Sequence, residues 1–77
     1  MDLNEFIKNF ADQLDDTDAA TITAETVFKD LDEWCSMTAL SVIAMVDAEY
    51  DVSIGGDVIQ NSTTIKDLFD KVSALRG

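Results

Sequence analysis

Residues 36–49 read SMTALSVIAMVDAE, and their apolar side chains recur at the spacing of an α-helix. At about 100° per residue they fall on two separate faces. One face carries Ala39, Val42, Ile43, Val46 and, one residue beyond the segment, Tyr50. The other carries Met37, Leu40, Ala44, Met45 and Ala48. A helix that packed on a core by one face only would be polar on its back. The segment therefore predicts a central helix with one face in the core and a second apolar face for another contact.

Upstream, a second amphipathic helix is predicted over residues 3–14, followed by a long connection over residues 15–35. The helix is indicated by apolar residues at helical spacing, namely Leu3, Phe6, Ile7, Phe10 and Leu14. The run from Asp15 to Asp18 breaks that pattern, and the threonines after it have low helix propensity. Four apolar residues are expected to pin the connection to the core: Ile22, Val27, Phe28 and Leu31. A connection of this length inside a small domain is often functional.

Downstream, Gly55 and Gly56 predict a turn, and residues 57–61 predict one short helical turn with Val58 and Ile59 facing inward. A last helix is predicted to start near Thr63 or Thr64. Thr64 and Asp67 have the spacing of a capping box, with aspartate in place of the usual glutamate or glutamine. The apolar stripe of this helix is Ile65, Leu68, Phe69, Val72 and Leu75.

The pattern as a whole predicts an all-α fold in a single domain over residues 1–77. We expect a small four-helix bundle of three main helices and one short helix, with a long first loop. No segment shows convincing strand alternation. The predicted core includes Ile43, Val46, Ile54, Ile59 and Leu68. Trp34 is expected to pack at the end of the long connection rather than to serve as a platform for a ligand.

Composition excludes several classes of function. Sixteen acidic residues against five basic ones give a formal charge of −11, so nucleic acid and anionic membrane surfaces are not expected partners. Basic patches on partner proteins are the expected binding surfaces. The single cysteine cannot form an internal disulfide, which favours a reducing cytoplasm, and we find no secretory signal or membrane span. The absence of histidine removes the commonest general base and neutral metal ligand.

The order of helix, long loop, helix, short helix and helix resembles the acyl carrier protein family along nearly the whole chain. The segment DEWCSMTALSVIAMVDAEYDVSI, residues 32–54, is similar to the central helix of that family together with the loop after it. Residues 63–72, TTIKDLFDKV, resemble its last helix. In the family a serine in Asp-Ser-Leu heads the central helix, and here the matching residues are Cys35, Ser36 and Met37.

The resemblance implies that Ser36 carries a 4′-phosphopantetheine group. In the family a separate transferase uses Mg²⁺ and coenzyme A, the serine becomes a phosphodiester, and the terminal thiol of the arm holds an acyl group as a thioester. The chain itself would then not be an enzyme. Two other interpretations of Ser36 stay open: a helix N-cap, for which serine is a preferred residue, and a catalytic serine. A catalytic serine would need a lysine base or a rarer kind of activation, and no lysine lies near it in sequence.

Cys35 stands where the family has an aspartate that helps the transferase recognise its substrate. Asp32 and Glu33 lie just upstream and could partly supply the missing charge. Three alternatives are open: a tolerated small residue, a reactive thiol activated by the helix N-terminus, or an engineered or variant position. We expect modification of Ser36 to survive but to be slower than with aspartate.

The second apolar face of the central helix implies a docking surface for the transferase and for acyl-processing enzymes, with burial as the alternative. Its expected members are Met37, Leu40, Ser41, Ala44, Met45, Asp47 and Ala48. Methionine suits a surface that meets several partners because it repacks easily. The family also implies a monomer, with fatty-acid, polyketide and aminoacyl cargoes all open.

Acidic residues can also form a calcium loop, but the pattern required for one is not met. In a loop starting at Asp16, Ala20, Thr21 and Val27 fall at positions that need an oxygen ligand, a glycine and a glutamate. No metal site is predicted. A small acidic adaptor that binds partners without any cofactor remains the alternative function, and it predicts partner binding that is indifferent to Ser36→Ala.

Overall fold

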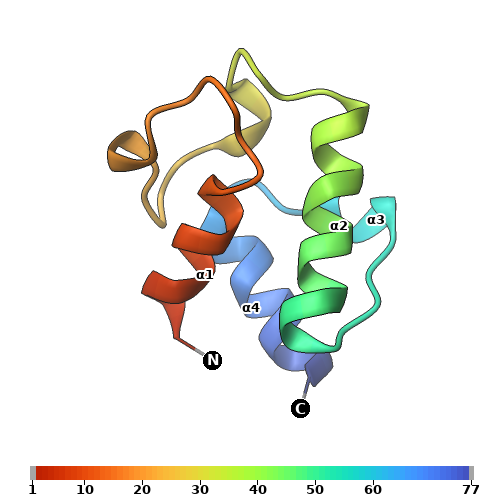
Figure 1. Cartoon of the computed structure of the whole chain (residues 1–77). Helices are drawn as coiled ribbons and strands as arrows, with labels where there is room; N and C mark the ends of the chain where they lie inside the picture. The colour runs from red at the N-terminus through yellow and green to blue at the C-terminus, as the bar shows by residue number, and fades with distance from the viewer. Residues whose placement is uncertain (1, 77) are drawn as a thin grey trace.

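The central helix and the elements around it follow the predicted order. A computed structural model describes residues 2–76 and, over that range, contains four α-helices, two short 3₁₀ turns and no β-strand (Figure 1). The elements are α1 (Leu3–Ala11), η1 (Ala19–Thr21), η2 (Phe28–Asp30), α2 (Ser36–Tyr50), α3 (Gly56–Gln60) and α4 (Ile65–Arg76). The prediction of a small all-α bundle with three main helices and one short helix is confirmed.

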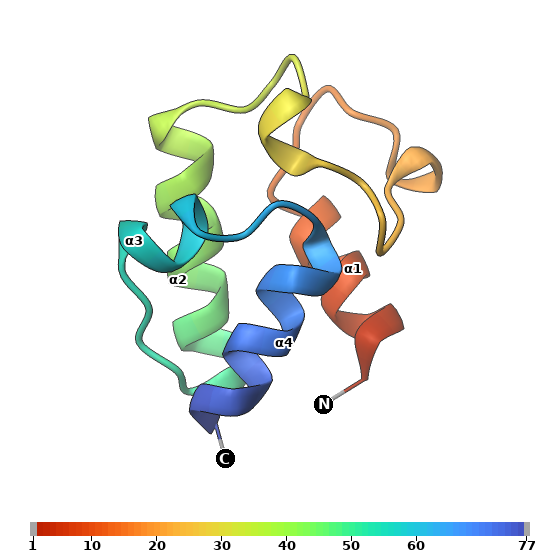
Figure 2. The same ribbon diagram turned by 180° about the vertical axis from the view of Figure 1, so that it is seen from behind.

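The helices surround one apolar core. α1 packs against α2 and α4, and α3 bridges α2 and α4. Figure 1 shows the long connection crossing the end of the bundle opposite the two chain ends and arriving at the first turn of α2. From behind, α3 lies beside α2 and leads into the segment that enters α4 (Figure 2). The start of α2 is therefore at the same end of the bundle as the long connection.

α1 is shorter than predicted. It ends at Ala11 rather than at residue 14, and the next residues form a tighter turn in which Gln13 N–H donates to Phe10 O and Leu14 N–H to Ala11 O, each at 3.0 Å. Leu14 is still buried. Its side chain reaches the core from the turn, so the apolar spacing extends past the end of the helix.

Aromatic stacking holds the long connection against the bundle. The Phe28 and Trp34 rings lie 4.9 Å apart between centroids, and Phe10 of α1 lies 5.5 Å from Phe28 and 6.1 Å from Trp34, nearly parallel to the indole. Trp34 thus packs at the end of the connection as predicted. Ile22 and Phe28 are buried and Leu31 is half-buried, as expected of pins.

The prediction that Val27 is a fourth pin is wrong, because its side chain is 37% exposed. The segment is held here by its backbone instead. Val27 forms an isolated antiparallel bridge with Thr64, and Thr26 O and Ala24 O accept from Ile65 N–H and Lys66 N–H at 3.2 and 2.9 Å. Backbone pairing leaves the valine side chain free to face solvent.

The chain reverses after α2 at Asp51 rather than at the glycines. Asp51 has a left-handed backbone (φ 56°, ψ 40°), and its N–H donates to Asp47 O at 3.0 Å. A short polar side chain tolerates this conformation better than most residues. Gly55 and Gly56 instead provide the N-cap and first residue of α3, so the predicted turn lies a few residues earlier than expected.

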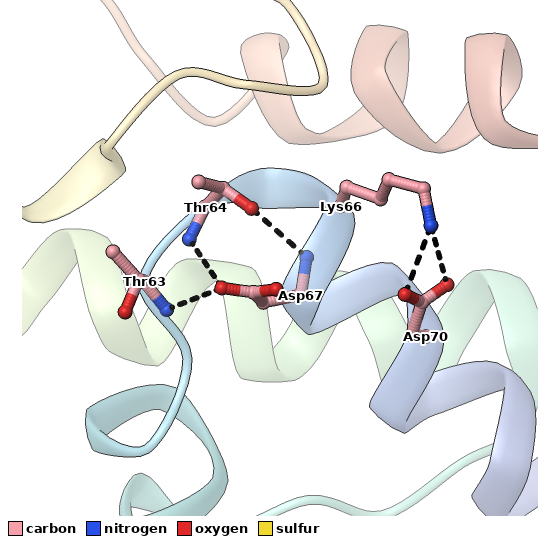
Figure 3. A network of polar contacts seen from close by, with 5 residues as sticks. All are labelled: Thr63, Thr64, Lys66, Asp67 and Asp70. Carbon is pink, nitrogen blue, oxygen red and sulfur yellow. Dashed lines mark hydrogen bonds and ion pairs between the residues drawn. The ribbon is translucent and has the colours of Figure 1, made fainter.

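The predicted capping box at the start of α4 is present (Figure 3). Thr64 Oγ1 accepts from Asp67 N–H at 3.1 Å, and Asp67 Oδ2 accepts from the N–H groups of Thr63 and Thr64 at 3.2 and 3.1 Å. In the same helix Lys66 pairs with Asp70, four residues later, at 3.0 Å on the exposed surface. The helix itself begins at Ile65.

The core agrees with the predicted apolar pattern except at its margins. Val46, Ile54, Ile59 and Leu68 are buried as expected. Ile43 and Val58 are half-buried. Leu75, assigned to the stripe of α4, is 59% exposed in the last turn of that helix.

None of the helices described over residues 2–76 combines the length and the apolarity that crossing a bilayer requires.

Candidate functional site

Ser36 is the first residue of α2, and its side chain is exposed. The N-cap position belongs to Cys35, which has an extended backbone (φ −158°, ψ −179°). The interpretation of Ser36 as an N-cap is therefore wrong by one residue: serine has a helical backbone and cysteine occupies the capping position. The serine hydroxyl is free of the capping role that most often explains a serine at such a place.

The backbone around Ser36 is suited to an anion. The first helical bond of α2 runs from Ala39 N–H to Cys35 O at 3.0 Å. The N–H groups of Ser36, Met37 and Thr38 precede it and have no acceptor within the helix. These donors and the positive end of the helix dipole favour a negatively charged group attached here.

A surface cavity of about 320 Å³ opens beside Ser36. It is lined by Lys29, Trp34, Cys35, Ser36, Ala39, Gly56, Ile59 and Gln60. These residues come from η2, the end of the long connection, the first turn of α2, and α3. The lining combines apolar side chains with one basic side chain, which suits a ligand with both apolar and anionic parts.

Lys29 is the site residue that sequence reasoning missed. Its ammonium donates to Gln60 O at 2.8 Å and lies 5.9 Å from the centre of the Phe28 ring. The contact joins the long connection to the last residue of α3. No local signal marks Lys29, because its place in the lining of this cavity depends on how the connection folds back over α2 and α3.

The thiol of Cys35 is exposed, and its pKa is lowered. The first cause is the hydroxyl of Thr38, 3.5 Å from the sulfur, which can turn its single proton from Glu33 O to a thiolate. The N–H groups of Thr38 and Met37 lower the pKa further, while desolvation and the Glu33 carboxylate raise it. The helix start thus outweighs the neighbouring acids in their effect on this thiol.

Glu33 is engaged elsewhere. Its carboxylate accepts from Asp15 N–H and Asp16 N–H at 2.9 and 2.6 Å and from Thr17 Oγ1 at 3.2 Å. The charge therefore holds the beginning of the long connection. Asp32, the other acid just before Cys35, is half-buried.

The predicted docking surface is exposed except at one residue. Met37 is 73% exposed and Leu40 is 60% exposed, and Ser41, Ala44, Asp47 and Ala48 are exposed as well. The hydroxyl of Ser41 turns back to Met37 O at 3.1 Å. The first two turns of α2 therefore present a small apolar patch next to Ser36.

The assignment of Met45 to the docking surface is wrong, because only 6% of its side chain is exposed. α2 is apolar around most of its circumference, so sequence defines the boundary between its faces poorly. Met45 lies three residues after Val42 and next to Val46, both of which are fully buried. Residues three apart are neighbours on a helix surface, and Met45 joins the core with them.

Among residues 2–76, no group of three or more histidine, cysteine, aspartate or glutamate side chains is placed to hold a metal ion.

Comparison with protein-family models, curated proteins and solved structures gave no match. The function is therefore inferred from the residues and their geometry.

Proposed function

We propose that this protein is a carrier whose Ser36 bears 4′-phosphopantetheine and that it conveys acyl intermediates for fatty-acid, polyketide or related biosynthesis. The observation that carries the proposal is the place of Ser36: an exposed hydroxyl on the first residue of the longest helix, at a cavity that also contains Lys29. The resemblance in helix order and in the central segment supports the same function.

The residues present suit this group. The exposed hydroxyl is accessible to a separate transferase, and the N–H groups at the start of α2 that have no acceptor within the helix can donate to the phosphate oxygens. When bound, the group would supply a flexible arm ending in a thiol that holds acyl groups as thioesters. The Oγ–phosphorus bond would form as the pyrophosphate bond of coenzyme A breaks, with adenosine 3′,5′-bisphosphate as the leaving group.

The chain itself supplies position and recognition rather than catalysis. It has no histidine, and the lysine that lines the cavity beside the serine donates to a carbonyl. A role for Ser36 as an attachment point fits this environment better than a role as a nucleophile activated by the chain's own residues. We place the protein in the cytoplasm as a monomer that meets the phosphopantetheinyl transferase and acyl-processing enzymes.

Intact-mass measurement after incubation with coenzyme A, Mg²⁺ and a broad-specificity phosphopantetheinyl transferase tests the attachment. We expect one phosphopantetheine group on the parent chain and none on Ser36→Ala. Cys35→Asp should be modified faster than the parent, because the carboxylate restores the charge that the transferase recognises in the family. No mass gain in a parent chain with a helical circular dichroism spectrum would overturn the proposal.

The exposed patch of Met37 and Leu40 is proposed to receive the transferase. Met37→Glu should slow modification while leaving the thermal unfolding temperature nearly unchanged, because the side chain is 73% exposed. Leu75→Glu is a matched control, since Leu75 is also an exposed apolar residue but lies in α4. Equal slowing by both variants would contradict a specific role for the patch.

A cofactor-free acidic adaptor is the second candidate, favoured by Cys35 at the position of the family's aspartate and by the apolar patch at the head of α2. It predicts that Ser36→Ala binds partner proteins as well as the parent chain does. Partner capture that requires the modified serine would exclude it.

A further inference from the structure

Two lysines hold the C-terminal end of α3. Lys29 of η2 donates to Gln60 O at 2.8 Å, and Lys71 of α4 donates to Asn61 O at 2.9 Å. These are adjacent carbonyl groups at the end of a helix, where the last carbonyls lack intrahelical donors and cations are favoured. The short helix is thus attached to the long connection by one lysine and to α4 by the other.

Only one of these lysines also lines the cavity beside Ser36. Lys29 and its acceptor residue Gln60 are both cavity residues, whereas Lys71 is not among them. Of the five basic residues in the chain, the other four are Lys8, Lys66, Lys71 and Arg76, which belong to α1 or α4. Over residues 2–76 the one ion pair is Lys66–Asp70, so the charge of Lys29 has no carboxylate partner within 4.0 Å.

We propose that Lys29 binds the phosphate carried by Ser36 and that it leaves the Gln60 carbonyl to do so, an inference that rests on the proposed function. A phosphodiester oxygen carries a full negative charge, so the Lys29 ammonium is attracted to it by a charge–charge interaction, whereas a carbonyl group offers only a dipole. The carbonyl of Gln60 is a neutral acceptor, and the residue is exposed, so water replaces the ammonium there at little cost.

The exchange has a structural consequence for α3. In the unmodified chain two lysines hold the end of this helix, and in the modified chain Lys71 alone holds it. Gly56, Ile59 and Gln60 of α3 form one wall of the cavity. Modification of Ser36 therefore loosens the wall of the cavity that α3 forms. This effect depends on one side chain, that of Lys29.

Amide NMR spectra of the unmodified and modified chain test this. The N–H of Asn61 belongs to the same peptide group as the Gln60 carbonyl, so its resonance reports whether that carbonyl has lost its lysine. We expect modification of the parent chain to shift the Asn61 amide resonance. In unmodified Lys29→Met the resonance should already be displaced, and modification should move it little further. Lys29→Arg should retain the response of the parent.

Lys71→Met is the matched control, since it removes the neighbouring lysine attachment without touching the cavity. It should displace the Ser62 amide resonance and leave the response of Asn61 to modification intact. A mass gain with an unmoved Asn61 resonance, or an equal response in Lys29→Met, would overturn this inference and leave the proposed function standing. Absence of any mass gain would overturn both, so the two failures are distinct.

Discussion

At the scale of single residues, Cys35 is where opposing electrostatic effects meet. Two acids lie just before it, Asp32 and Glu33, yet its pKa is lowered because the Thr38 hydroxyl and the N–H groups of Thr38 and Met37 favour the thiolate. The carboxylate of Glu33 is drawn toward the amides of Asp15 and Asp16. The thiol of Cys35 at the capping position therefore ionises more readily than an ordinary thiol, because of the groups at the start of the helix that it precedes.

The pH dependence of alkylation measures this effect. A lowered pKa means that the thiolate forms at a lower pH than for an ordinary cysteine, so the midpoint of iodoacetamide reactivity should lie below that of a free thiol. Thr38→Val removes the largest cause of the lowering and should move the midpoint to higher pH. Ser41→Ala is the control, because the Ser41 hydroxyl donates to Met37 O, and its midpoint should equal that of the parent. A midpoint unaffected by Thr38→Val would contradict the assignment.

At the scale of elements, α2 shows how one helix can serve a core and a surface with the same residue types. Its two methionines differ sharply: Met37 is 73% exposed and Met45 is 6% exposed. Both are predicted on the docking face, and only the first is there. Apolar residues lie around most of the circumference of α2, so the burial of each one depends on which faces of the helix the other elements cover.

The two methionines make a matched pair for stability. Met45→Ala should lower the free energy of unfolding by about 2–5 kcal/mol, the usual cost of truncating a buried methionine. Met37→Ala should change it by no more than about 0.5 kcal/mol, as is usual at the surface. Urea denaturation of the two variants and the parent measures the difference. Equal losses would show that Met37 is packed in solution and not available for docking.

The start of α4 should show a dependence of stability on pH. The N–H groups of Thr64 and Thr63 lower the pKa of Asp67 below its ordinary value. A carboxylate with a lowered pKa in the folded state stabilises the fold fully above its unfolded pKa, and that stabilisation is lost as the pH falls through the folded value. Asp67→Asn should therefore unfold at a lower temperature than the parent at neutral pH, and the gap should close in acid, below about pH 4.

Thermal melts of both chains across this range check the prediction. Asp70→Asn is the control, since Asp70 takes part only in the exposed pair with Lys66. A gap for Asp67→Asn that persists unchanged in acid would mean that the amide differs from the acid for a reason other than charge.

At the scale of the whole molecule, net charge acts against the fold. A formal charge of −11 on 77 residues produces repulsion that the compact state concentrates. Over residues 2–76 the single ion pair is exposed and offsets little of it. The negative electrostatic field of the chain instead favours partner proteins with basic surfaces.

Added salt should therefore raise the thermal unfolding temperature, because counterions screen the repulsion between like charges. Melts at low and high sodium chloride measure the shift. Choline chloride at equal ionic strength should give the same increase, since the effect is one of screening and needs no bound cation. A melting temperature that falls with salt would contradict the role of repulsion.

The fold was predictable to the extent that its causes are local. The helical spacing of Leu3, Phe6 and Phe10 predicted α1, and the Thr64–Asp67 spacing predicted the cap of α4, because both depend on neighbours within a turn or two. Two of the wrong predictions, those for Val27 and Met45, concern packing. Val27 is exposed and Met45 is buried for reasons that lie in the segments against them.

Ser36 became a candidate through the resemblance of its segment to the acyl carrier protein family, whereas the order of helices and the all-α class could be inferred from residue types and their spacing, since capping and amphipathic periodicity are properties of short segments. The cavity beside Ser36 could not. It depends on Lys29 and Gln60, which are 31 residues apart in the chain and meet only because the long connection folds across the bundle. Contacts of that range are selected by how the whole core packs, and the tertiary structure alone decides them.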